Sequence, residues 1–396
     1  MKTGTQGFSG DRLNLARRAR GLTAKALAET VGVSAQSISQ YEKDTHKPQH
    51  EVFRRICSVL NMPTDYFLRQ PVEREVVPIY WRSRATSTKG ARDRVEVRLD
   101  WLKDITEYLG GFFDFPLLSI PEVDVPDDFR QITQGDIETA ALSLRRHWGL
   151  GVGPLPDLVQ EMENNGILIS RTFMGAEKQD ALSQFAPEYP NPFVILGTDR
   201  ASAVRQRFDA AHELAHLLLH RNVPEKCWRT PLDYKQLEEQ AHKFASSFLL
   251  PEEGFASELW APTLDSFLAL KERWGASIAA MIMRCDALNI THEGMTRRLF
   301  INMSKRGWRN NEPLDNSMVK EKPRLLRRSI EMLLSERVKS VAQIVSELAL
   351  NPHDIEELCE LDAGTLSGAS LDAKASPTFK SDFAPNVVQF PGRNQP

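Results

Sequence analysis

The most constraining feature of the chain is the stretch AAHELAHLLLH, residues 210–220, which holds three of the nine histidines among 396 residues. When residues 204–220 are placed at about 100° per residue, as in an α-helix, six polar side chains fall within one arc of roughly 100°. Apolar residues fill most of the remaining surface, so the helix is expected to pack inside the protein with its polar stripe lining a cleft. That stripe consists of Arg205, Asp209, His212, Glu213, His216 and His220.

Two of these histidines have the spacing of metal ligands. His212 and His216 lie four positions apart, so on a helix they share one face and can bind the same ion. Neutral imidazole suits zinc, and Glu213 is placed to act as the catalytic base. The alternative is a buried helix with a solvated polar edge, which one isolated histidine would favour. The whole constellation instead predicts one Zn²⁺ per chain, with His220 and Asp209 as outer partners of the ligands.

A third ligand is expected because catalytic zinc usually has three protein ligands and one open position. The segment LEEQAHKFASSFLLP, residues 237–251, offers candidates. On a helix, Glu238 borders the apolar stripe on the side shared with His242, whereas Glu239 points nearly opposite, toward solvent. We therefore expect Glu238 to be the ligand and His242, one turn further on, to support it. The alternative is that both glutamates lie on the surface.

The two motifs together resemble a known family. RFDAAHELAHLLLH followed by EEQAHKFASSFLLP is similar to the ImmA/IrrE metallo-endopeptidases, gluzincin-like proteases that cleave bacterial repressors. The resemblance covers about residues 150–255 and implies a zincin-like α+β domain. It also implies that the glutamate three residues before the alanine of the second motif completes the zinc site, and that residue is Glu238. The chain has His242 where the family often has asparagine.

The first seventy residues have a different character. Residues 11–70 predict four short helices, with Gly21 ending the first and Thr23 and Ser34 capping the next two. Residues 1–70 contain eleven Lys/Arg and six Asp/Glu, although the whole chain has a formal net charge of −3. A basic module on an otherwise acidic protein suggests contact with a polyanion.

Part of this module, GLTAKALAETVGVSAQSISQYEKDTHKP, resembles the lambda-repressor-like (Cro/CI-type, XRE) helix-turn-helix. The resemblance implies a recognition helix, about Ala35 to Lys43, in the major groove of a double-stranded DNA operator. The chain departs from the family at Ala24, where glutamine is common. The alternative is a helical bundle that docks on the rest of the protein. The expected base contacts are Gln36, Ser37 and Gln40. The expected phosphate contacts are Arg17, Arg18, Lys43 and Lys47.

The expected architecture is multidomain and mostly α. In the central unit, two helices precede the β-like runs ILISRTF, ALSQFA and PFVILG, so we expect an α+β domain with its helices on one side of a small sheet. The expected parts are a helix-turn-helix domain at 1–70, a linker and helical connector at 71–133, a metallopeptidase domain at 134–260, a helical C-terminal region at 261–361 and a disordered tail at 362–396.

Composition excludes several classes of protein. The four cysteines have no paired spacing, which argues against a disulfide framework and against a cysteine-based zinc site. No apolar run has the length of a signal peptide or a membrane span, so a cytoplasmic protein is expected. Residues 297–339 hold twelve Lys/Arg and five Asp/Glu. We interpret this segment as a solvated helical surface rather than a second nucleic-acid contact.

These observations predict a DNA-binding transcriptional regulator, as a monomer or homodimer, whose zinc endopeptidase cleaves a protein substrate, a repressor, in response to a signal. In one alternative the protease-like domain only senses or dimerises; in another the helix-turn-helix docks a repressor. The run PFVILG is expected to be an edge strand that receives the substrate. The cleaved bond is expected in a separate protein rather than in residues 71–100, because an unregulated tethered enzyme would destroy itself.

Overall fold

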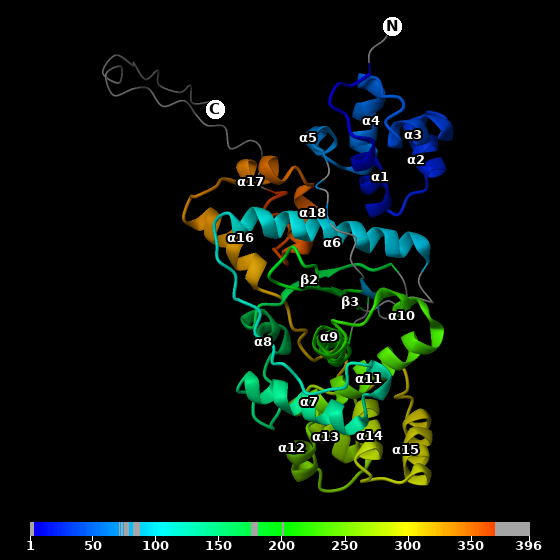
Figure 1. Ribbon diagram of the computed structural model, residues 1–396, viewed down its shortest axis with the longest axis vertical. Helices are drawn as coiled ribbons and strands as arrows, with labels where there is room; N and C mark the ends of the chain where they lie inside the picture. Colours follow the sequence, from blue (N-terminus) through cyan, green and yellow to red (C-terminus); the bar gives the residue numbers. More distant parts are fainter. Residues whose placement is uncertain are drawn as a thin grey trace, which may run out of the picture.

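The computed structural model describes residues 4–70, 72, 74, 79–81, 88–175, 181–199 and 202–368. These residues form a mostly helical molecule with one small sheet near its middle (Figure 1). The prediction of a mostly α architecture with a central α+β unit is therefore confirmed. None of the helices in these ranges is both long and apolar enough to cross a membrane.

The N-terminal part is a bundle of short helices. Thr23 and Ser34 cap α2 and α3 as expected, each accepting a hydrogen bond from a backbone N–H in the first turn. Gly32 ends α2 with a φ of 75°, a left-handed conformation that glycine adopts without steric cost. A fifth helix follows the four that the sequence predicts. The helices are α1 (Gly10–Ala19), α2 (Ala24–Val31), α3 (Ala35–Glu42), α4 (His50–Leu60) and α5 (Thr64–Leu68).

The sheet contains β1 (Tyr80–Trp81), β2 (Leu168–Thr172), β3 (Ala181–Gln184) and β4 (Phe193–Gly197). Its spatial order is β1-β3-β4-β2, with β2 parallel to β4 and the other two pairs antiparallel. The expectation that PFVILG forms an edge strand is wrong, because this run is β4 and pairs on both sides. The edges of the sheet are β1 and β2.

Helices cover both faces of the sheet, so the expectation of helices on one side is also wrong. Alternate residues of β4 enter different hydrophobic cores: Val194 and Leu196 belong to the first, Phe193 and Ile195 to the second. A strand that is apolar at successive positions has no solvent-facing side, and its run of hydrophobic residues predicts burial on both faces.

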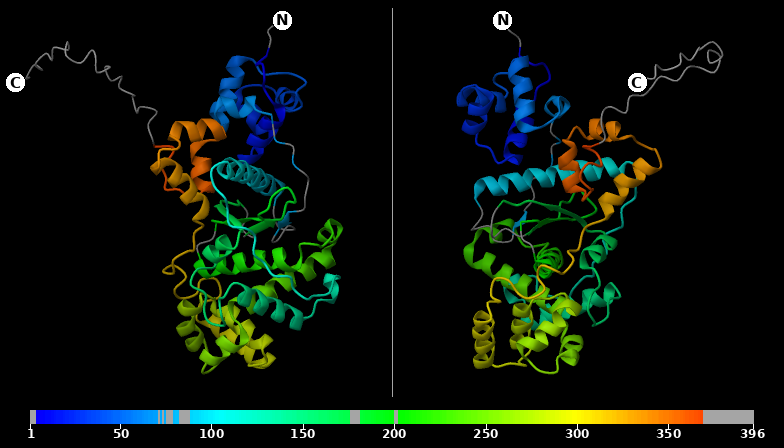
Figure 2. Two further views of the ribbon diagram at one scale, coloured as in Figure 1. Left: turned by 60° about the vertical axis from the view of Figure 1, so that its left-hand side comes forward. Right: turned by 180° about the vertical axis from the view of Figure 1, so that it is seen from behind.

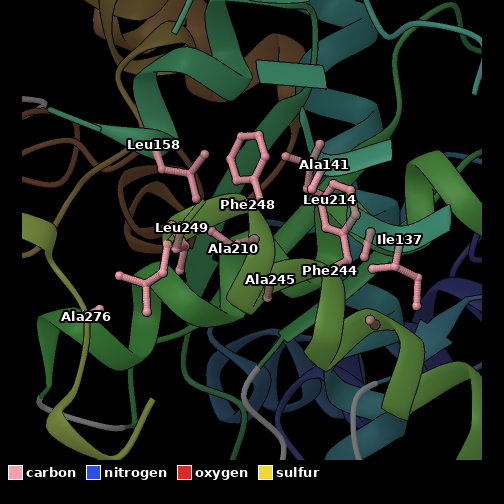
Figure 3. Packing of buried hydrophobic residues seen from close by; sticks show 14 of the residues in the cluster. Ile137, Ala141, Leu158, Ala210, Leu214, Phe244, Ala245, Phe248, Leu249 and Ala276 are labelled. Atoms are coloured by element: carbon pink, nitrogen blue, oxygen red, sulfur yellow. The ribbon is translucent and has the colours of Figure 1, made fainter. Parts of the chain in front are cut away.

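The first core lies on the α9 side of the sheet, and Figure 3 shows part of its packing, including Leu214 of α9 and Phe244 and Phe248 of α11. The helices on this side are α7 (Gln134–His147), α8 (Leu158–Asn164), α9 (Ala203–Leu219), α10 (Glu225–Arg229), α11 (Pro231–Leu249), α12 (Glu252–Glu258), α13 (Leu264–Trp274), α14 (Ile278–Ala287) and α15 (Glu293–Lys305), together with the 3-10 turn η2 (Phe129–Gln131).

The second core lies on the opposite face of the sheet, around the long helix α6, and continues into the N-terminal bundle (Figures 1 and 2). The region expected as one unit at 261–361 is therefore divided, because α13–α15 pack in the first core and the later helices in the second. The backbone N–H groups of Leu366 and Ser367 donate to Glu356, so packed structure continues past 361; residues 369–396 of the expected tail lie outside the described residues. The helices on this side are α6 (Lys89–Gly110), α16 (Leu325–Ser335), α17 (Val341–Leu348) and α18 (Pro352–Leu358).

The N-terminal bundle docks on α6 through its α1 and α5 side. The indole N–H of Trp101 donates to the Tyr66 hydroxyl at 3.2 Å inside the second core. Arg20 pairs with Asp354 of α18 at 2.6 Å. This docking leaves α3 on the far side of the bundle from α6 (Figure 1).

Candidate metal centre

The AHELAH segment lies on α9, which packs between the sheet and α11 (Figure 1). His212, Glu213 and His216 each have 0% of their surface exposed. Burial of three ionisable side chains on one helix needs compensating polar partners, because an uncompensated buried polar group costs several kcal/mol. Those partners come from α11 and from β3.

The ligand atoms converge as a zinc site requires. The Nε2 atoms of His212 and His216 are 3.1 Å apart, and each lies 3.5 Å from a carboxylate oxygen of Glu238 on α11. Zinc–ligand bonds of about 2.0–2.1 Å at the tetrahedral angle place neighbouring ligand atoms about 3.3–3.4 Å apart. The three side chains chosen from the sequence therefore fit one zinc ion by donor type and by spacing. Glu239 instead lies on the exposed side of α11, 3.7 Å from Lys235.

The charge state of Glu238 also suits a ligand. Burial raises the pKa of this carboxyl group, but its interactions with the His212 and His216 rings outweigh burial and hold its pKa well below the ordinary value. The group is therefore an anion, the form in which a carboxylate binds metal.

A chain of hydrogen bonds fixes the tautomer of His216. The Gln240 amide donates to the Phe129 carbonyl at 2.7 Å, which directs its oxygen toward His220 Nε2 at 3.1 Å. Burial and the neighbouring His216 lower the pKa of His220 well below its ordinary value, so its ring is neutral. Its Nε2 then carries the proton, and its Nδ1 accepts from His216 Nδ1 at 2.8 Å. His216 Nε2 is left with a lone pair facing the other ligands.

This arrangement gives His220 the supporting position expected from the sequence and adds Gln240, which the sequence analysis missed. No motif marked Gln240, because its partners lie 20 residues away at the C-cap of α9 and 111 residues away in η2. Asp209 is 3% exposed and lies on α9 one turn before His212.

His242 lies beside the three expected ligands. Its ring offers a nitrogen within 4.8 Å of ligand atoms of His212 and Glu238. Its Nδ1 donates to the backbone carbonyl of Glu238 at 2.7 Å, which fixes the ring against the turn that carries this ligand. The ring centroids of His242 and His212 are 4.6 Å apart. His242 thus supports Glu238 through the backbone and stands at the rim of the centre.

Glu213 is held from the sheet. The hydroxyl of Ser183, on β3, donates to Glu213 Oε2 at 2.6 Å. This bond orients the buried Glu213 carboxylate, and it places β3 directly against the candidate metal centre. Ser183 was missed because the run ALSQFA shows that a strand is present but not which strand faces α9.

The outer edge of β3, the strand beside the candidate metal centre, pairs with the connector. Tyr80 and Trp81 of β1 lie opposite Ser183 and Leu182 of β3 in an antiparallel pair. From its sequence, the connector is expected to form a strand or extended linker over EVVPIYWRS and a helical stretch after it, to about Leu109. Its described residues contribute this short strand and the helix α6, Lys89–Gly110.

The residues expected to contact DNA fall into two groups. Gln36, Lys43 and Lys47 are exposed, and Ser37 and Gln40 are partly exposed, on or next to α3. The other two differ from expectation. Arg17 pairs with Glu42 at 2.5 Å inside the bundle. Arg18 pairs with Asp93 and Glu96 of α6 at 3.1 and 2.7 Å. These contacts do not support a phosphate-binding role for the two arginines.

Comparison with known proteins finds two family models that match parts of this chain. Residues 162–286 match the family model of an IrrE N-terminal-like domain, and residues 10–73 match that of a helix-turn-helix domain. The chain therefore carries a helix-turn-helix domain of the XRE type and an IrrE/ImmA-like domain, as the two resemblances implied.

Two curated relatives are similar over a short stretch. The chain is 34% identical over 59 residues to the HTH-type transcriptional regulator ImmR of Bacillus subtilis (strain 168), which is 15% of this chain and 46% of that protein. It is 33% identical over 58 residues to an uncharacterized HTH-type transcriptional regulator of Sinorhizobium medicae (strain WSM419), 15% of this chain and 42% of the relative. The chain thus spans less than half the length of the curated relatives that it matches.

Proposed function

We propose that this protein is a DNA-binding transcriptional regulator whose IrrE-like domain is a zinc-dependent endopeptidase. The observation that carries the proposal is the convergence of His212, His216 and Glu238 at 3.1–3.5 Å beside a buried Glu213. Two imidazoles, one carboxylate and a neighbouring glutamate base are the set that zinc-dependent peptide hydrolysis needs.

The roles of the residues follow from their contacts. His212, His216 and Glu238 would hold the zinc ion, which when bound would act as a Lewis acid on the scissile carbonyl and on the attacking water. Glu213 accepts a proton from the attacking water and delivers it to the leaving amine. Ser183 keeps the Glu213 carboxylate in position for both transfers, through its 2.6 Å hydrogen bond. The His220–Gln240 pair keeps the lone pair of His216 directed at the metal position.

The substrate is bound as an added strand on β3 rather than on β4. Extended peptides bind by joining an exposed sheet edge, and β3 is the strand that contacts Glu213. The pairing of β1 with β3 supports this mode, because a segment of this same chain adopts it. While β1 occupies the edge, a substrate strand is excluded, so peptidase activity follows a signal that releases the connector.

The helix-turn-helix domain binds an operator through α3. Gln36 and Gln40 read base edges, and Lys43 and Lys47 hold phosphates. Gln36, Lys43 and Lys47 are exposed and Gln40 is partly exposed, which supports this role. Because regulators with this motif usually read two half-sites about one helical turn apart, the protein binds as a homodimer.

The substrate is a separate repressor protein. The test is co-expression of wild type or Glu213→Gln with the repressors encoded beside the gene, followed by mass spectrometry. Repressor fragments with wild type, absent with Glu213→Gln, support the proposal. A folded, zinc-loaded wild type that cleaves none of these proteins would favour a domain that only senses or dimerises. Incubation of the wild type alone tests self-cleavage instead. A cut between residues 71 and 100 would make the connector of this chain the substrate.

A further inference from the structure

A large cavity lies next to the metal centre and has no part in the proposed hydrolysis. Its volume is about 760 Å³. It is bounded by the first half of α9, the second half of α11, helix α14 and residues 309–316, and we call it the α14 cavity. Sites for small organic ligands typically measure about 300–1,000 Å³, so its size is that of a ligand site.

One wall of the α14 cavity is built by a buried ion cluster. Lys271 is 0% exposed and donates to Glu312 and Asp315, each at 2.7 Å. Glu312 also accepts from the backbone N–H groups of Ile278 and Ala279, at 2.8 and 3.0 Å, which fixes residues 309–316 against the start of α14. The wall is thus held by charge pairs rather than left as a loose loop.

The lining combines apolar surface with cationic side chains. Val204, Phe208, Ala280 and Met283 supply apolar surface, and 52% of Met283 is exposed. Lys243 and Arg309 also line the cavity, and both are exposed. Within the described residues, neither of these two side chains makes a hydrogen bond or an ion pair.

The acidic side chains of the lining are already engaged. Glu312 and Asp315 are held by Lys271, and Asp286 accepts from the Thr296 hydroxyl at 2.8 Å. Arg284 is likewise engaged, since it pairs with Glu138 and donates to the Leu250 carbonyl at 2.8 Å. The charges left to meet a ligand include Lys243 and Arg309, which favour an anion.

We propose that the α14 cavity binds a small organic anion with an apolar body, such as a carboxylate or sulfonate attached to a hydrocarbon. The apolar body lies against Phe208, Ala280 and Met283, and the anionic group meets Lys243 and Arg309. This binding depends only on the cavity, so it goes beyond the proposed peptidase function and does not require it.

The position of the α14 cavity lets its occupant act on the metal centre. His242 lines the cavity and also stands within 4.8 Å of ligand atoms of His212 and Glu238. The Phe208 and His242 rings are 5.8 Å apart, so an apolar ligand packed on Phe208 also lies close to His242. A bound anion therefore lies close enough to His242 to influence the candidate metal centre.

The experiment uses the full-length protein and the fluorescent probe anilinonaphthalene sulfonate, which is itself an apolar anion. Probe binding is measured for wild type and for Lys243→Glu, Arg309→Glu and Met283→Glu, each of which puts a carboxylate into the lining at an exposed position. Arg297→Glu, an exposed charge reversal on α15 outside the cavity, is the matched control. Decanoate and decyltrimethylammonium, which have the same tail length and opposite charge, then compete with the bound probe.

The expected result is probe binding that decanoate displaces at a concentration at least about tenfold lower than decyltrimethylammonium does. Each cavity substitution should weaken binding about tenfold or more, while Arg297→Glu binds like wild type. For Lys243→Glu and Arg309→Glu this is the effect of losing one charge-assisted hydrogen bond. For Met283→Glu it is the effect of placing a carboxylate against an apolar, anionic probe. Equal displacement by the two competitors would overturn the proposal. The proposal would also be overturned if the cavity variants bound the probe as tightly as wild type, or if Arg297→Glu lost as much probe affinity as they do. A folded wild type that binds no probe would overturn it as well. Repeating the titration after zinc removal separates this result from the peptidase proposal, because the cavity should still bind the probe, although coupling to the metal centre can change its affinity.

Discussion

Replacement of Glu238 by glutamine should remove zinc from the protein, whereas replacement of its neighbour Glu239 should not. Both substitutions exchange a carboxylate for an amide of the same shape on the same helix. The Glu238 oxygens lie 3.5 Å from the Nε2 atoms of His212 and His216. The Glu239 carboxylate lies 3.7 Å from Lys235 on the exposed side. The two variants therefore differ in position and in little else.

The expected magnitude follows from the number of ligands. Tetrahedral zinc sites bind with about 10–16 kcal/mol, so each of four ligands contributes on the order of 3–4 kcal/mol. Loss of the Glu238 ligand should weaken zinc binding by about 100–1,000-fold. The ion pair lost in Glu239→Gln is an exposed one between residues four apart, worth about 0.3–0.5 kcal/mol of folding stability, with no effect on the metal.

The assay is competition between each protein and a chromophoric zinc chelator, with metal content after dialysis measured by mass spectrometry. Circular dichroism of each variant controls for folding. The wild type and Glu239→Gln should each retain about one zinc per chain. Tight zinc binding by a folded Glu238→Gln variant, or its loss in a folded Glu239→Gln variant, would refute the ligand assignment.

Four further predictions test other parts of the molecule. Glu213→Gln should keep its zinc but lose peptide cleavage, as metal analysis and a peptidase assay on one sample will show. Gln40→Ala should cost about 1–3 kcal/mol and relax operator preference, whereas Lys47→Ala should weaken binding to all sequences and flatten its salt dependence in titrations. Burial raises the pKa of Glu163 to about 7. Its contribution to folding stability is therefore full below its ordinary pKa and is lost as pH rises through 7. The free energy of unfolding in urea should fall between about pH 5 and pH 8, and Glu163→Gln should make this fall smaller by about 3 kcal/mol. Trp81→Pro removes a backbone donor from β1 and should speed both hydrogen exchange in β3 and cleavage of added peptides.

The proposed metal ligands could be chosen from the sequence because helical periodicity is local. The angle between two side chains on a helix follows from their separation, so the histidine pair and the choice of Glu238 over Glu239 required no tertiary information. The structure places these three side chains at ligand spacing. The same reasoning located Thr23 and Ser34 as helix caps.

Sheet order could not be derived in this way, because strand pairing joins residues far apart in the chain. The run PFVILG fits an edge strand or an interior strand equally well, and only its pairing with both β2 and β3 distinguishes the two. The Ser183–Glu213 bond spans 30 residues and depends on this order. For the same reason the sequence could not show that Arg18 pairs with α6, 75 and 78 residues away.

The docking of the helix-turn-helix bundle bears on which bond the proposed peptidase would cut. Cleavage ends DNA occupancy only if it separates the DNA-binding part from something that it needs. The bundle is held on α6 by the buried Tyr66–Trp101 contact and on α18 by the Arg20–Asp354 ion pair, both independent of the connector. A cut within residues 71–88 would leave these contacts in place, so the bundle would stay attached and the protein would keep its shape. Cleavage of a separate repressor would not be opposed by these contacts, because both lie within this chain. The geometry therefore favours a separate protein as the substrate, with the connector acting as the segment that covers β3.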